Sequence, residues 1–305
     1  MTTHKIATDT IPVLAARGTT RRRWLNSARL WAGCGWVARH VLAVALGMLF
    51  ALPLVWALLT SLKTNAQVYV VPPKWIPDPI VWSNYPEALT RVPFLRYMLN
   101  TVKVTIPSVI GAVLSNTIVA YGFARIRWRH RNIFFIVCIS TMMIPYQVIM
   151  VPLFITFKKL GWLNTYLPLI VPAFFASPYF IFLLRQFFMT IPAELSDAAR
   201  VDGCSEWMIL TRIIIPLSVP ALAVVALFEF MGTWGDYLGA LLYLGREELY
   251  TVAVGLSRYQ AGGWSQANWS YLMAASVTSI APILLLFFVA QRTFIEGITL
   301  TGLKG

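Results

Sequence analysis

The sequence predicts an all-helical protein that crosses a membrane several times. Of its 305 residues, 58% are hydrophobic and only 12% are charged, whereas charged residues make up about 25% of a soluble domain. Six long apolar stretches are each able to cross ~30 Å of bilayer hydrocarbon as a helix. These observations exclude a soluble enzyme and a disordered chain. The three cysteines are too few and too scattered for a disulfide framework.

The six stretches divide the chain into membrane spans and connecting segments. The predicted spans are about 41–62, 104–124, 133–157, 165–184, 217–238 and 271–290. Residues 1–38 are polar and lack the apolar run of a cleaved signal peptide, so we interpret them as a mobile cytoplasmic tail. Residues 39–305 then form one six-span domain.

The distribution of basic residues predicts that both termini are cytoplasmic. On that topology the inside segments are 1–40, 125–132, 185–216 and 291–305, and they contain sixteen of the 25 Lys and Arg residues. Such an excess is typical of cytoplasmic loops. The net charge of +13 could instead indicate nucleic-acid binding. The run Arg125, Arg127, Arg129, Arg131 lies between two spans, however, which favours phospholipid head groups over nucleic acid as its partner.

The segment 191–216, between spans four and five, differs from a plain loop. It contains four of the twelve acidic residues, which are Glu194, Asp197, Asp202 and Glu206. Pro192 and Gly203 bracket a predicted helix over about 193–201, with Gly203 supplying a left-handed turn. A second helix then continues into span five.

The composition of this predicted helix indicates a docking site for a partner protein. We expect one apolar side, formed by Leu195, Ala198, Ala199 and Val201. The polar side is expected to hold Glu194, Asp197 and Arg200. The small alanines allow another surface to approach closely.

A motif in this segment resembles that of a known family. Asp197-Ala-Ala, three residues, Gly203, nine residues and Ile213-Ile-Ile-Pro216 resemble the EAA motif of permease subunits of ATP-binding-cassette (ABC) importers, Glu-Ala-Ala-x3-Gly-x9-Ile-x-Leu-Pro. The chain departs from the pattern at Asp197, where Glu is usual, and at Ile215, where Leu is usual.

Other matches are similar to the maltose-type, carbohydrate-importing branch of that family. They are Ala120-Tyr-Gly-Phe-Ala-Arg125, Met143-Ile-Pro145, Gly161-Trp-Leu-Asn-Thr165, Trp234-Gly-Asp236, Glu296-Gly297 and Gly302-Leu-Lys-Gly305. Gly235 departs from the usual Asn. The resemblance covers about residues 40–305, with the permease core at about 96–292.

The resemblance implies a type I ABC importer permease that is not itself an enzyme. Two permease subunits, expected to be a heterodimer, would form the pathway. Two cytoplasmic ATPases would drive it by alternating access, and an external binding protein would deliver a sugar. The chain contains no Gly-x4-Gly-Lys-Ser/Thr motif, so ATP and Mg are expected to bind the partner ATPase and no cofactor is expected here. The resemblance also implies the cell membrane of a prokaryote.

The resemblance assigns ATPase contact to two parts of the chain. The coupling residues would be Glu194, Asp197, Ala198, Ala199, Asp202, Gly203 and Pro216. The C-terminal residues Gly302, Lys304 and Gly305 would form a second contact. The alternative for Asp202 is a solvated residue at a helix end.

Glu229 is the most unusual residue within the predicted spans. An intramembrane carboxylate is costly and marks a functional candidate, although a protonated or subunit-paired structural role remains an equal alternative. Trp234, Asp236 and Tyr237 follow towards the outer end of span five, and with Glu229 they are candidates for the pathway or gate. An ion-coupled secondary transporter or channel using Glu229 is the alternative function. No catalytic residues and no metal ligands are expected.

Overall fold

The computed structural model describes residues 18–260 and 268–302, and for 18–35 and 292–302 it describes only the course of the helix. Every regular element within these ranges is helical, and none is a strand. The prediction of an all-helical fold is therefore confirmed.

The longer helices account for most of the chain. The three longest are α1 (Gly18–Ser61), α4 (Phe94–Ala124) and α15 (Trp269–Gly302). Those of intermediate length are α5 (Arg131–Ser140), α6 (Tyr146–Lys159), α8 (Pro178–Thr190) and α12 (Val219–Trp234).

Shorter elements connect the long helices. The short α-helices are α2 (Asn65–Val68), α3 (Asn84–Arg91), α7 (Leu167–Ile170), α9 (Ala193–Val201), α10 (Glu206–Ile209), α11 (Ile215–Leu217), α13 (Leu238–Tyr243) and α14 (Val252–Ser257). Single turns of 3₁₀-helix are η1 (Thr141–Met143), η2 (Val171–Phe175), η4 (Glu247–Leu249) and η5 (Arg258–Gln260). The element η3 (Leu210–Ile214) is a stretch of π-helix.

Four segments are long and apolar enough to cross a membrane without a sharp bend, namely Trp36–Ser61, Phe94–Ala124, Leu167–Thr190 and Trp269–Gln291. Two helix pairs pass the same test but are bent: Arg131–Met143 with Tyr146–Lys159 by 95°, and Glu206–Leu217 with Val219–Trp234 by 81°. Counting each bent pair as one span gives the six predicted spans. The third and fifth predicted spans are thus bent, with Pro145 at the first break and Ser218 at the second.

The chain divides into two units, Met1–Trp56 and Ala57–Gly305. The first unit contains most of α1, which begins at Gly18 and so takes up part of the segment that we interpreted as a mobile tail. Residues 1–17 lie outside the described residues. The predicted boundary at residues 38–39 thus falls inside α1.

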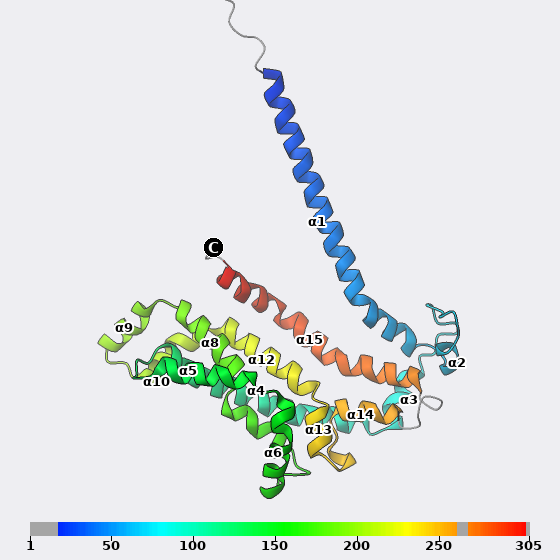
Figure 1. Ribbon diagram of the computed structural model, residues 1–305. Coiled ribbons are helices and arrows are strands. Elements are labelled where there is room, and N and C mark those ends of the chain that lie inside the picture. The colour runs from blue at the N-terminus through cyan, green and yellow to red at the C-terminus, as the bar shows by residue number, and fades with distance from the viewer. Residues whose placement is uncertain (1–17, 261–267, 303–305) are drawn as a thin grey trace, which may run out of the picture. The chain divides into compact units, whose positions relative to one another are not determined.

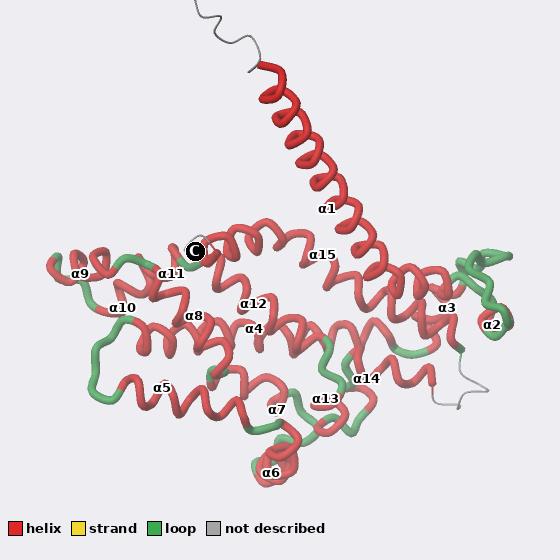
Figure 2. The backbone as a smooth tube through the Cα atoms, turned by 45° about the horizontal axis from the view of Figure 1, so that its top comes forward, coloured by secondary structure: helices red, strands yellow, loops and turns green. Residues whose placement is uncertain are grey.

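The second unit is built around α4. This helix packs against both α8 and α12, and α12 in turn packs against α15 (Figure 1). Within this unit, α9 and α10 lie at one end of the long helices, and α3 and α14 lie at the other (Figure 2).

A hydrophobic core lies at each end of α4. At the α9 end the core joins α4, α8, α9 and α12 through residues that include Tyr121, Leu184, Ala199 and Val225. At the opposite end a second core brings Tyr97 of α4 together with α3, α14 and α15. The packing therefore connects α9 directly to the long helices.

Polar side chains on α4 support the irregular start of the fourth span. This span is interrupted between η2 and α8, where Ala176 adopts a positive φ of 51°. The Asn116 side chain accepts a hydrogen bond from the Ser177 backbone N–H at 2.7 Å, and Ser115 donates to the Ala173 carbonyl at 3.1 Å. These bonds satisfy backbone groups that lipid cannot satisfy.

We predict that Gly255→Ala destabilises the second unit. A Cβ at this position would lie 2.2 Å from Cδ2 of Tyr97. Tyr97 is fully buried and its hydroxyl donates to Glu247 at 2.9 Å, so its ring has no free space to enter. The expected loss is about 1–3 kcal/mol of unfolding free energy, as for other overpacked cores.

Thermal unfolding of the purified chain in detergent measures this effect. Gly122→Ala is the control, because a Cβ there meets nothing within 4 Å, and alanine in a helix interior is favoured over glycine by about 1 kcal/mol. An equal melting temperature for the two variants would contradict the packing described here.

Candidate functional site

The segment 191–216, here called the coupling segment, begins where α8 ends. Ile191 is extended, and Pro192 occupies the cap position immediately before α9 with φ −53°. Proline is tolerated there because the first N–H groups of a helix have no partner within the helix. The helix α9 spans Ala193–Val201, so the predicted helix is confirmed.

Gly203 ends α9 as the sequence predicted. It has a φ of +82°, and its N–H donates to the Arg200 carbonyl at 3.1 Å. The Cys204 N–H donates to the Ala199 carbonyl at 2.9 Å. Ser205 then caps α10 by accepting the Met208 N–H at 3.3 Å. The turn between α9 and α10 is therefore stabilised by hydrogen bonds among neighbouring residues.

The faces of α9 differ from the predicted ones. Ser196 and Ala199 are buried, at 1% and 7% exposure, and Ala199 packs into the core of the chain itself. Leu195 and Val201 are exposed, Val201 by 88%. The four apolar residues thus do not share one side, because their positions on a helix spread over too wide an angle. Ala199 faces inward and is not available as a contact.

The outward surface of α9 combines apolar and acidic side chains. Its exposed residues include Glu194, Asp197, Ala198 and Val201, and Asp202 and Gly203 extend it past the end of the helix. Pro216 is also exposed, but it lies further along the chain in α11.

Arg200 holds the two helices of the coupling segment together. Its guanidinium bonds to Asp197 at 2.7 Å on the same helix and to Glu206 at 2.7 Å at the start of α10. The hydrogen bond with Glu206 is the main cause that raises the pKa of Arg200. The Asp197 carboxylate therefore already forms an ion pair within the chain.

Two residues that the site prediction did not include attach the coupling segment to α4. The Tyr121 hydroxyl donates to the Glu206 carboxylate, and Nη2 of Arg125 donates to the carbonyls of Phe188, at 2.6 Å, and Ile191. Both residues belong to the motif Ala120-Tyr-Gly-Phe-Ala-Arg125. Their spacing of four residues places them on one helix face. This spacing was the one feature of the sequence from which their shared role could have been predicted.

Arg125 is positioned to bind the end of α8. The last carbonyls of a helix have no partner within the helix and favour a cation. Arg185 of α8 makes the reciprocal contact, donating to the Phe123 carbonyl of α4 at 3.2 Å. Burial is the main cause that lowers the pKa of Arg125.

The pathway candidates differ in their surroundings. Trp234 is buried at 5% exposure, and its indole N–H donates to the Ser279 carbonyl of α15 at 3.0 Å, which makes it a packing residue. Glu229 is half-buried and accepts a hydrogen bond from Thr233. Asp236 accepts the Gly239 N–H at 2.9 Å, while Tyr237 is exposed.

The C-terminal contact lies mostly beyond what the structure describes. Gly302 is the last residue of α15, and Lys304 and Gly305 lie outside the described residues. Among the described residues no group of three or more His, Cys, Asp or Glu side chains is arranged to hold a metal ion.

Comparison with known proteins identifies relatives over most of the chain. The family described as "Binding-protein-dependent transport system inner membrane component" matches residues 116–299. The probable ABC transporter permease protein YurM of Bacillus subtilis is 30% identical over 93% of this chain and 91% of its own length. The arabinooligosaccharides transport system permease protein AraQ of Halalkalibacterium halodurans is 37% identical over 68% of this chain and 73% of its own.

Solved structures resemble the fold. A chain from the crystal structure of a bacterial ABC transporter involved in the import of the acidic polysaccharide alginate aligns with a TM-score of 0.74 and 26% identity. The alignment covers 88% of this chain and 98% of that one. In a second structure, of the bacterial alginate ABC transporter in complex with an alginate pentasaccharide-bound periplasmic protein, a chain aligns with a TM-score of 0.59 and 17% identity.

We predict that Arg125→Gln destabilises the protein because it removes the charged donor to two helix-terminal carbonyls. A hydrogen bond to a charged group contributes about 1.5–3 kcal/mol, and that is the expected loss of unfolding free energy. Thermal unfolding in detergent measures it. The matched control is Arg129→Gln, since Arg129 is an exposed arginine of the same loop. Equal destabilisation by both substitutions would contradict the role assigned to Arg125.

Proposed function

The chain belongs to the family of binding-protein-dependent transport system inner membrane components, and from that premise we propose the role of each part of its fold. It is a multi-pass membrane protein and a permease subunit of an ABC importer for sugars, not an enzyme. The observation that supports the role of the coupling segment is α9, a short exposed helix fixed to the ends of α4 and α8.

The energy for transport comes from partner subunits. The sequence contains no phosphate-binding Gly-x4-Gly-Lys-Ser/Thr loop, so ATP and Mg bind two separate cytoplasmic ATPase subunits. The exposed surface of α9 is the proposed contact with one of them; it includes Glu194 near the start of the helix, Val201 at its C-terminal end and Asp202 just after it. Gly302, Lys304 and Gly305 are proposed as a second contact.

The proposed topology has both termini in the cytoplasm. It places the basic loop 125–131 and the coupling segment on the same side as the ATPases, as the excess of positive charge favours. The membrane is proposed to be the cell membrane of a prokaryote, because the relatives YurM and AraQ are bacterial proteins. A second, different permease subunit completes the pathway.

The proposed mechanism is alternating access. Because Ala199 belongs to the same core as Tyr121, Leu184 and Val225, a displacement of α9 moves α4, α8 and α12 together. Packed cores switch between discrete arrangements and do not deform continuously. Closure of the ATPases would thus open the helices towards an external binding protein.

The proposed substrate is a sugar or a sugar derivative. Relatives include permease proteins of transport systems for arabinooligosaccharides and for sulfoquinovosyl glycerol in Agrobacterium fabrum; a further relative belongs to a system for sn-glycerol-3-phosphate, which is not a sugar. Glu229, Asp236 and Tyr237 remain the candidates for contact with it in this chain, since none of them is fully buried.

Copurification of the ATPase tests the proposed contact. We expect Val201→Asp to reduce the amount of ATPase recovered with the tagged permease about tenfold, since replacing an apolar contact residue with a charged one weakens an interface by ~1–3 kcal/mol. Val71→Asp is the control, because Val71 is equally exposed, 89% against 88%, and lies in the predicted external loop. Undiminished recovery with Val201→Asp would exclude α9 as the contact.

We predict that Gly203→Val uncouples transport from ATP hydrolysis. A β-branched residue resists the φ of +82° found here, at a cost of ~1–2 kcal/mol in the left-handed region. The variant chain should still insert in the membrane, but sugar-stimulated ATPase activity of the assembled importer should fall strongly. Gly203→Asn should retain most of that activity, since asparagine tolerates this conformation. Normal stimulation with valine would refute the role of the turn.

A further inference from the structure

A basic cavity of about 200 Å³ lies between the loop after α4 and the helix α9. Four arginines line it: Arg125, Arg127, Arg131 and Arg200. Ser196 and Asp197 line it from α9. The cavity therefore joins the basic run identified in the sequence to the coupling segment.

The charges of this cavity favour an anion. Its lining contains four guanidinium groups and one carboxylate, and that carboxylate, Asp197, is already bonded to Arg200. Arg200 also bonds to Glu206, and Nη2 of Arg125 donates to neutral carbonyls. Excess positive charge is thus left with Arg125, Arg127 and Arg131.

Two buried donors in the cavity wall lack a partner. Ser196 is 1% exposed, and its Oγ makes no hydrogen bond to any described residue. Nε of Arg125 is likewise buried and unpaired among the described residues. Both residues line the cavity, and an unsatisfied buried donor costs about 1–3 kcal/mol, so a ligand whose acceptor oxygens reach these atoms would recover that free energy.

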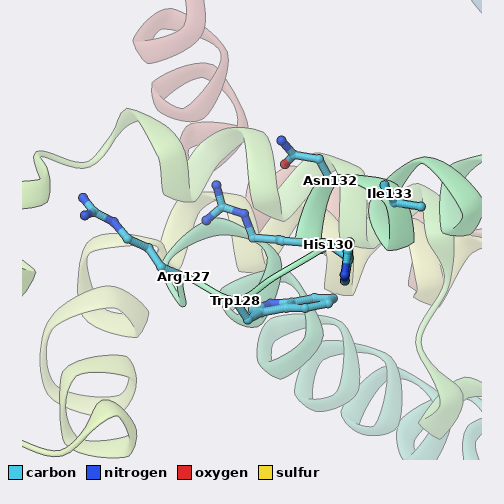
Figure 3. A pocket seen from close by; sticks show the side chains of 6 residues that line it. Arg127, Trp128, His130, Asn132 and Ile133 are labelled. Carbon is cyan, nitrogen blue, oxygen red and sulfur yellow. The ribbon is translucent and has the colours of Figure 1, made fainter.

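The surroundings of the cavity are those of a lipid head group. An adjoining open hollow of about 390 Å³ shares Arg127 and Arg131 with it, and Trp128 and His130 line the hollow on the side away from the Arg127 guanidinium (Figure 3). Ile133 of α5 also lines the hollow, and it and the next residue, Phe134, are 58% and 57% exposed, as expected of lipid-facing residues. Tryptophan and arginine are typical of the boundary between head groups and hydrocarbon.

We propose that this cavity binds the phosphate group of an anionic phospholipid. The phosphate bonds to Arg127 and Arg131 from the loop and to Ser196 from α9, while the acyl chains follow the apolar surface of α5. Basic pockets on the cytoplasmic side of membrane helices bind anionic head groups in this way. A bound lipid would bridge the loop and the coupling segment, so the lipid composition would affect how firmly α9 is held.

Lipid binding to the detergent-purified importer complex tests the proposal. The probe is dioctanoyl-phosphatidylglycerol, titrated while thermal unfolding is followed, with dioctanoyl-phosphatidylcholine and inorganic phosphate as separate arms. We expect saturable stabilisation by phosphatidylglycerol and none by phosphatidylcholine. Inorganic phosphate should compete weakly.

Variants locate the site. Arg127→Gln and Arg131→Gln should each weaken phosphatidylglycerol binding about fivefold, since each basic residue contributes ~1 kcal/mol. The control Arg129→Gln removes the same charge from the same exposed loop but from a residue that does not line the cavity. Ser196→Ala should also weaken binding, without changing the charge.

Several results would overturn the proposal. Equal weakening by Arg127→Gln and Arg129→Gln, with no effect of Ser196→Ala, would indicate a diffuse basic surface instead of a site. Stabilisation by inorganic phosphate but not by phosphatidylglycerol would assign the cavity to a dissolved ion. Binding by the isolated chain that is lost in the ATPase-containing complex would show that the partner occupies the cavity. None of these results depends on the Val201→Asp experiment, so the two proposals fail separately.

Discussion

The constraint on which the structure depends is that lipid offers no hydrogen-bond partner to the backbone. A broken or terminated helix within the membrane therefore needs side chains from its neighbours. Here α4 supplies them: Asn116 and Ser115 bond to the backbone at the break in the fourth span. At its end, Arg125 bonds to the last carbonyls of α8. The polar residues of this otherwise apolar helix thus determine where the chain is allowed to depart from regular helix.

The same bonds explain why α9 is suited to transmitting force. A helix of nine residues is marginal by itself, because short isolated helices are unstable in water. It is held by Ala199 in the core, by Arg200 between the two helices, and by Tyr121 of α4 through Glu206. A segment held at several points moves with the helices to which it is attached. The coupling segment is therefore an extension of α4 and α8, and not a flexible loop.

The sequence predicted most accurately the features that depend on neighbouring residues, such as helix ends and turns. Hydropathy indicated apolar segments that the structure forms, within the described residues, as four long helices and two bent helix pairs. The bounds of α9 and the positive φ of Gly203 followed from Pro192 and from the glycine itself. It failed where the outcome depends on packing between distant segments. Whether Ala199 faces the partner or the core depends on α8 and α12, and Trp234 finds its hydrogen-bond acceptor on α15, 45 residues away. Hydropathy likewise did not predict the 81° bend between Glu206–Leu217 and Val219–Trp234.

The replacement of the family's glutamate by Asp197 has a physical consequence for the proposed ATPase contact. Asp197 is exposed and paired with Arg200 at 2.7 Å, and an exposed ion pair contributes only about 0–1 kcal/mol. Val201, by contrast, is 88% exposed in the isolated chain, and burying such a side chain contributes about 1.5–3 kcal/mol. The shorter side chain of Asp197, already bonded to Arg200 within α9, thus weakens the ionic contribution to the contact. That contribution is smaller than the one from burying Val201. On the proposed contact, the apolar surface of α9 would therefore provide most of the affinity for the ATPase, and the acidic residues around it would set the orientation in which it binds.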